Sequence, residues 1–156
     1  MKRIFIVYAL LALGIFVAGV ILAQSDLLVM VDAPSLALVL GPTILMLLSH
    51  YSPGEFINAF RSAMARSSAD ERELKNALLF FSTAQTLMIA STIVAVFLGI
   101  IMILAAVWKG NPASAKILSG WMAVDFISIL YLGLGMLLVT VPFKSAVQKK
   151  LNEIKS

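Results

Sequence analysis

Four long apolar runs constrain this chain more than any other feature of its sequence. They cover about residues 4–23, 33–48, 77–108 and 120–142, without strand-like alternation or a repeating polar face. A helix needs about 20 apolar residues to cross the hydrocarbon core of a bilayer. Backbone polar groups find no water in lipid, so only helices or closed barrels satisfy them, and these run lengths favour helices. The predicted fold is therefore all-α: an integral membrane protein with four transmembrane helices.

The composition agrees with a membrane protein and excludes several chemical classes. Of the 156 residues, 61% are hydrophobic and 13% are charged, whereas soluble domains are about half apolar and a quarter charged. Cysteine is absent and His50 is the single histidine, so neither a metal site nor a cofactor is predicted. The sequence has no phosphate loop, nucleophile–base pair or carboxylate dyad, which predicts that the protein is not an enzyme.

The lysines and arginines set the predicted orientation. With a cytoplasmic N-terminus, ten of the 12 basic residues lie inside and two outside. The inside group is Lys2, Arg3, Arg61, Arg66, Arg72, Lys75, Lys144, Lys149, Lys150 and Lys155, and the outside pair is Lys109 and Lys116. The positive-inside rule thus predicts two cytoplasmic termini, a cytoplasmic loop over 49–76 and a cytoplasmic tail over 143–156. Because the net charge of +4 is distributed in this way, it predicts contact with the bilayer and not with nucleic acid.

The first run also begins like a secretory signal peptide. It follows Lys2 and Arg3, and Ala23-Gln24-Ser25 resembles a cleavage site. Its apolar core is longer than the roughly 7–15 residues of a signal-peptide core, which favours a retained helix.

The cytoplasmic loop contains a predicted amphipathic helix. Ser52 is placed as its N-cap, with Pro53 at the first position and Glu55 at the third. Apolar residues then recur at helical spacing at Phe56, Ala59, Phe60 and Met64. This helix is expected to lie on the membrane or against its neighbours. The mixed charges over 70–75 are interpreted as a solvated face.

Asp125 is the ionisable side chain that stands out within the predicted spans. Such a carboxylate costs roughly 2.5–3.5 kcal/mol at the bilayer centre and is by default a functional candidate. Its distance from Gly120 is on the order of 8 Å along the helix, shallow enough to reach water or to pair with Lys116. An ion-pathway role and a structural role at a helix interface both stay open. Ser128 shares its helix face at i+3 and is a second candidate.

The third run adds further hydroxyl groups. Ser91 and Thr92 either line an ion route or bond back to carbonyls of their own helix. Nearer its start, Ser82, Thr83, Gln85 and Thr86 are expected either to project into the cytoplasm or to be buried among helices.

The second run carries capping and kinking residues. Asp32 or Ser35 is expected to be its N-cap, with Pro34 in the first turn. Gly41-Pro42 interrupts the same run, and the proline is expected to kink the helix unless neighbours satisfy the freed carbonyl.

Three stretches of the sequence resemble the MotA/TolQ/ExbB family of bacterial inner-membrane motor and channel proteins, MotA most of all. Residues 29–43, which include Asp32, Ser35 and Gly41, are similar to the family's Phe-Val-Asp-x-x-Ser start of the second helix and its following Val-x-Gly-Gly. The segment from Ser52 to Phe60 resembles the one that leaves this helix. Met122-Ala123-Val124, Leu130-Tyr131, Pro142 and Leu151 resemble the fourth helix in the same register.

This resemblance implies a function and partners. It implies a ring-forming homo-oligomer, a pentamer, around two single-span proteins of the MotB/TolR/ExbD type in the bacterial inner membrane. The partner's aspartate would carry protons or sodium past hydroxyls of helices three and four, and Ser128 matches a channel-lining threonine. The family's Gly-Thr pair falls on Ala95-Val96 or Phe97-Leu98, so that hydroxyl is missing here. The large cytoplasmic domain of MotA is replaced by residues 49–76.

Three functional hypotheses follow from these observations. The first is a MotA-like subunit of an ion-driven motor or channel complex, with Asp125 and Ser128 assisting the partner. The second is a channel-inactive scaffold or assembly protein of the same family, suggested by the lost Gly-Thr pair and the missing domain. The third is a small cation transporter that uses Asp125.

Overall fold

The structure of the protein, a computed structural model, describes residues 2–22, 31–64, 70–109 and 115–155. All regular secondary structure in these ranges is helical, which confirms the all-α class. The elements are α1 (Lys2–Leu22), α2 (Ala33–His50), α3 (Pro53–Met64), α4 (Glu71–Trp108), α5 (Ala115–Gly135), the π-helix η2 (Met136–Thr140) and α6 (Val141–Lys155).

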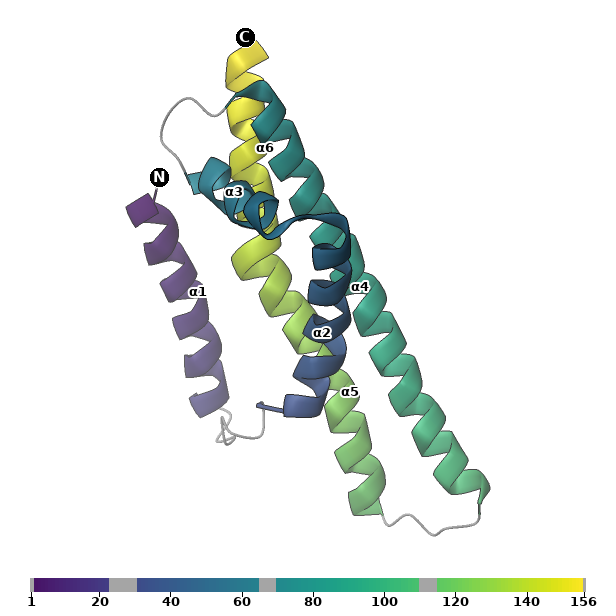
Figure 1. Cartoon of the computed structure of the whole chain (residues 1–156). Coiled ribbons are helices and arrows are strands. Elements are labelled where there is room, and N and C mark those ends of the chain that lie inside the picture. Colours follow the sequence, from purple (N-terminus) through teal and green to yellow (C-terminus); the bar gives the residue numbers. More distant parts are fainter. Residues whose placement is uncertain (1, 23–30, 65–69, 110–114, 156) are drawn as a thin grey trace.

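Two long antiparallel helical rods form the centre of the molecule (Figure 1). One rod is α4, and the other is the continuous series α5, η2 and α6. Helix α2 packs against α4 and α5, and α3 packs against α4 and α6 near the C-terminus. Helix α1 stands apart from the others in Figure 1, and its described side chains are exposed except for the half-buried Ala12.

Three helical stretches in the described residues are long and apolar enough to cross a membrane: Ala33–His50, Glu71–Trp108 and Leu118–Ile154. Helix α1 contributes a shorter apolar stretch, Leu10–Gly19. The chain therefore has the helices of a membrane protein, while the count of four spans and the orientation remain predictions.

Several helix boundaries differ from the predicted spans. Helix α4 begins at Glu71, six residues before the predicted span, and α5 begins at Ala115, five residues before its span. An apolar run indicates which residues can lie in the hydrocarbon of a bilayer. A helix can extend beyond that run wherever its residues find packing partners. In α4 this extension places Leu74 in the buried core and pairs Glu71 with Lys75, whose Oε1 and Nζ atoms are 2.7 Å apart.

The helix also continues past Pro142, where a span end was predicted. Proline has no N–H to donate, and its ring crowds the carbonyl four residues earlier, here that of Leu138. The helix widens into η2 just before the proline, and the N–H of Val141 donates to the Met136 carbonyl five residues back. A π-turn of this kind accommodates the local disruption without ending the helix.

Helix α2 begins as one of the two predicted alternatives. Asp32 is the N-cap, because its Oδ2 accepts a hydrogen bond of 2.8 Å from the Ser35 N–H, and Pro34 lies in the first turn. The helix runs without a break through Gly41 and Pro42 to His50. Pro42 therefore does not divide the span.

An aromatic cluster forms the core at the end of the molecule where α3, α4 and α6 meet. The predicted amphipathic helix is α3, and it packs against its neighbours through Phe56, Ala59 and Phe60, although Met64 is exposed. The cluster consists of Tyr51, Phe56, Phe60, Phe80, Phe81 and Phe143. Most of its ring pairs meet edge to face, a geometry that adds to the burial energy of each ring.

The predicted cap of α3 is a reciprocal capping box. The Ser52 backbone N–H donates to Glu55 Oε2 at 2.8 Å, and the Glu55 N–H donates to Ser52 Oγ at 3.3 Å. The Ser52 hydroxyl also donates to the same carboxylate oxygen at 2.9 Å. The bonds from the Ser52 backbone N–H and hydroxyl lower the pKa of Glu55 below its ordinary value.

This capping box predicts a pH dependence of the α3 start. Because the folded pKa of Glu55 lies below the unfolded value of about 4.3, its contribution to stability is present above that pH. The contribution is lost as the pH falls through the folded pKa. Ser52→Ala is expected to raise the pKa of Glu55 toward its ordinary value, because one of its two donors is removed. An NMR titration of the Glu55 side-chain carbon measures this shift.

The control is Ser49→Ala, at another exposed serine that bonds to Met46 and His50 and not to Glu55. It should leave the Glu55 titration unchanged. An unchanged Glu55 pKa in Ser52→Ala would contradict the capping-box assignment.

Candidate functional site

Three hydroxyl groups of α2 and its end contact the neighbouring helices. Ser35, Thr43 and Tyr51 are spaced eight residues apart, which turns each about 80° around the helix axis from the one before. Ser35 accordingly meets α5, whereas Thr43 and Tyr51 meet α4. Thr43 Oγ1 donates to its own Val39 carbonyl at 2.7 Å and lies 3.3 Å from Ser91 Oγ on α4. Tyr51 Oη lies 3.2 Å from Thr83 Oγ1, also on α4. Such bonds hold helices together in an apolar environment.

The start of α2 is tied to α5 by further hydrogen bonds. The Asp32 N–H donates to the Tyr131 hydroxyl at 2.8 Å, and the buried Ser35 hydroxyl donates to the Val124 carbonyl at 3.2 Å. Two of the three stretches that carry the family resemblance, residues 29–43 and the stretch from Met122 to Tyr131, are therefore in direct contact.

Asp125 lies beside this junction and faces α4. A Cβ atom at Gly99 would overlap the Asp125 carboxylate, so the glycine leaves the space that this carboxylate occupies. Asp125 is half-buried, and no described residue donates a hydrogen bond or a positive charge to it. From Ile93 to Val107, α4 carries no polar side chain. The side chain of the predicted partner Lys116 lies outside the described part of the structure.

The candidate hydroxyls are satisfied within the chain. Ser128 is buried and donates to the Val124 carbonyl at 3.2 Å, the same oxygen that accepts from Ser35. Thr92 is buried and donates to the Met88 carbonyl at 2.9 Å. In the described residues, no hydrogen bond joins Ser91 or Thr92 to Ser128 or Asp125. Ser128 and Asp125 are neighbours on α5, yet one bonds beside α2 and the other lies against α4.

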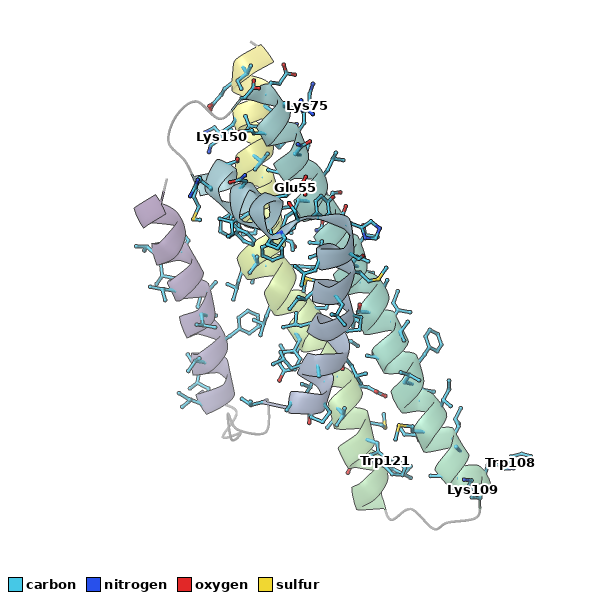
Figure 2. All side chains as sticks on the ribbon, in the orientation of Figure 1. Glu55, Lys75, Trp108, Lys109, Trp121 and Lys150 are labelled. Carbon is cyan, nitrogen blue, oxygen red and sulfur yellow. The ribbon has the colours of Figure 1, made fainter. Side chains whose placement is uncertain are left out.

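The contacts also fix the depth of Asp125 relative to the helix ends. Ser35 meets Val124, and Gly99 meets Asp125, so the start of α2 is level with Asp125. Helix α4 continues for nine residues beyond Gly99 to Trp108, which is about 14 Å at the rise of an α-helix. Figure 2 shows Trp108, Lys109 and Trp121 at this end of the molecule, and Glu55, Lys75 and Lys150 at the other. Asp125 thus lies level with the Ser35 contact, between the hairpin end and the hydroxyl contacts of Thr43 and Tyr51.

The polar start of the third run packs among helices in part: Ser82, Thr83 and Gln85 are half-buried, whereas Thr86 is exposed. Thr83 contacts Tyr51 of α2, and Ser82 and Gln85 accept hydrogen bonds from Lys144 of α6 at 3.3 and 3.2 Å. Lys150 of α6 donates to the carbonyl of Ser62 at the end of α3, at 2.6 Å.

Sequence reasoning missed Gly99, Lys144 and the role of Tyr131. Gly99 sits in an apolar run where nothing distinguishes it from other glycines, so no signal marks it. In the described residues, no group of three or more acidic or histidine side chains is arranged to hold a metal.

Comparisons with known proteins identify no relative. No protein-family model matches the chain, and searches of curated proteins and of solved structures return no match. The resemblance to the MotA/TolQ/ExbB family therefore depends on the residues quoted above alone.

Proposed function

We propose that this protein is a MotA-like membrane subunit of an ion-driven complex that works with a single-span partner. The observation that carries the proposal is the junction of α2, α4 and α5. There, residues of two of the family-like stretches bond to each other, and Asp125 lies beside them against Gly99. A carboxylate that no described residue neutralises, at the junction of apolar helices, is the type of group that relays protons or binds cations in membranes.

The roles of the candidate residues differ in this proposal. Asp125 is the group that takes up and releases the ion, because no described side chain neutralises it. Ser128 and Ser35 position α5 against α2 through their shared acceptor, the Val124 carbonyl. Since the hydroxyls of Thr92 and Ser128 are occupied within the chain, the partner helix must supply the rest of the route. That requirement agrees with the need for a MotB-like partner.

The proposal predicts that Asp125→Asn abolishes ion flux. Asparagine keeps the shape of the side chain but neither releases a proton nor carries a negative charge. Proteoliposomes containing the complex, with the partner that copurifies from its own host, should show flux in the wild type. In Asp125→Asn the flux should fall to that of protein-free vesicles, as measured with a pH-sensitive dye and, separately, a sodium-sensitive dye.

Asp70→Asn is the matched control, because Asp70 is an exposed aspartate outside the apolar part of α4. It should conduct like the wild type. Ser128→Ala should reduce flux less than Asp125→Asn, since its hydroxyl is bonded within the chain. Equal flux in the wild type and in an Asp125→Asn, Ser128→Ala double variant would refute the mechanism.

A channel-inactive scaffold is the second candidate. It is favoured by the occupied hydroxyls and by the apolar residues Val96 or Leu98 on α4, on which the family's threonine falls. Native mass spectrometry in mild detergent separates the candidates. Five copies with two single-span proteins would support the ion-driven complex, and five copies alone would support the scaffold. A monomer or dimer would favour the cation transporter.

A further inference from the structure

Lys144 occupies an unusual position at the start of α6. It follows Pro142 by two residues and is half-buried against α4. Its Nζ donates to Ser82 Oγ at 3.3 Å and to Gln85 Oε1 at 3.2 Å. Both partners are neutral, and an ammonium group carries three donors. The contacts therefore fix the position of the charge and leave one donor available.

No described acidic residue compensates this charge. Within the described residues, no carboxylate oxygen lies within 4.0 Å of Lys144 Nζ, and Glu71 pairs with Lys75 instead. Lys150, further along α6, differs because the negative charge of Glu153 acts on it. A half-buried positive charge with neutral partners only is unfavourable unless a negative group approaches it.

A second polar group lies in the same seam, the contact of η2 and α6 with α4, and it has no hydrogen-bond partner among the described residues. Thr140 is 3% exposed, and its hydroxyl has no hydrogen-bond partner in the described structure. It precedes Lys144 by four residues, so both lie on the side of the helix that faces α4. Buried hydroxyls almost always have a partner. Thr140 therefore marks a second polar position beside Lys144, although the protein encloses its oxygen and keeps it out of reach of a group bound outside.

This seam lies where the apolar surface ends. Val139 and Val141, just before Lys144, are exposed and apolar, and so is Ile89 on α4, four residues past Gln85. Beyond Lys144 the exposed side chains on these helices include Lys149, Lys75 and Arg72. Such a change from apolar to charged surface is the depth at which lipid headgroups meet a membrane protein. Basic groups between helices at that depth recognise anionic lipids.

We propose that Lys144, held by Ser82 and Gln85, binds the phosphate of an anionic phospholipid in the leaflet around the α3–α6 end. The phosphate oxygens accept from the free donor of Lys144 and from the Ser82 hydroxyl, which has a hydrogen to donate. The negative charge of the lipid balances the ammonium charge. A zwitterionic lipid brings its own cation, so its attraction to Lys144 is weaker. This site is independent of the ion-driven function.

Titration with phosphatidylglycerol, followed by native mass spectrometry in mild detergent, tests the site. The wild type is expected to bind this lipid more tightly than phosphatidylcholine. Lys144→Gln should weaken phosphatidylglycerol binding about fivefold, the factor expected for loss of one lysine near an anionic surface. Lys144→Arg, which keeps the charge, should retain the preference.

Lys149→Gln is the matched control, because Lys149 is exposed on the same helix. It should bind phosphatidylglycerol like the wild type. Equal losses in Lys144→Gln and Lys149→Gln, or no loss in either, would overturn the site. Displacement of the lipid by millimolar inorganic phosphate would identify a free-anion site and overturn the lipid assignment. Circular dichroism checks that Lys144→Gln folds. If it does not fold, the wild type alone decides. Equal binding of phosphatidylglycerol and phosphatidylcholine would then overturn the proposal, and a preference for phosphatidylglycerol would support it.

Discussion

Phe81→Ala is expected to lower the free energy of unfolding by about 3–5 kcal/mol, the usual cost of truncating a buried phenylalanine. Phe81 is 1% exposed, and its ring contacts those of Phe60, Phe80 and Phe143 at centroid distances of 5.2, 5.3 and 5.6 Å. These rings come from α3, α4 and α6. The substitution therefore removes the contact that joins all three helices at this end of the molecule.

Equilibrium unfolding in mixed micelles, followed by circular dichroism, measures the loss. Phe97→Ala is the control, because Phe97 lies on the same helix and is 60% exposed. That variant should unfold close to the wild type. Phe81→Leu, which keeps most of the apolar volume, should cost clearly less than alanine. A loss below about 0.5 kcal/mol for Phe81→Ala, the range of surface substitutions, would show that the cluster does not hold α3 in place.

The apolar runs predicted the helices well, but not where the helices end. Hydropathy reports contact with lipid, and α4 begins before its apolar run because Leu74 finds a buried position among α3 and α6. At Pro142, where the predicted span ends, the helix continues because the disruption by the proline is local and η2 absorbs it. The bounds of an apolar run therefore do not locate the ends of a helix.

Local signals proved reliable in the capped helices. Asp32 with Ser35, and Ser52 with Glu55, form caps over three residues, so the sequence holds all the information that their geometry needs. The contacts between helices differ in kind. The contact between Ser35 and Val124 depends on the position of α2 along the axis of α5. The packing of residues far apart in the sequence sets that position.

In the candidate site, too, the sequence does not predict which side chains meet between helices. The i+3 spacing of Asp125 and Ser128 correctly placed them close together on α5. It did not predict that Asp125 lies against α4 while Ser128 bonds to the carbonyl that α2 also uses. A helix face is wide enough to meet two neighbours, and only the arrangement of those neighbours decides which one each side chain contacts.

Gly99→Leu is expected to destabilise the protein by about 1–3 kcal/mol, the usual cost of overpacking a filled interior. The first added atom, Cβ, already overlaps the Asp125 carboxylate, so α4 and α5 must separate or Asp125 must adopt another rotamer. Gly133→Leu on α5 is the control, because a Cβ there meets nothing within 4 Å. Equilibrium unfolding in mixed micelles compares the two variants with the wild type.

A double-mutant cycle assigns the cost of Gly99→Leu to its cause. Asp125→Ala removes the atoms that the new side chain meets, so Gly99→Leu should cost less in that background than in the wild type. The expected coupling is about 0.5–3 kcal/mol, the range for residues in direct contact. An additive result would mean that leucine at position 99 meets something other than Asp125. Because Asp125 is also the proposed ion-binding group, coupling would show that the space over Gly99 holds its carboxylate at the junction of α2, α4 and α5.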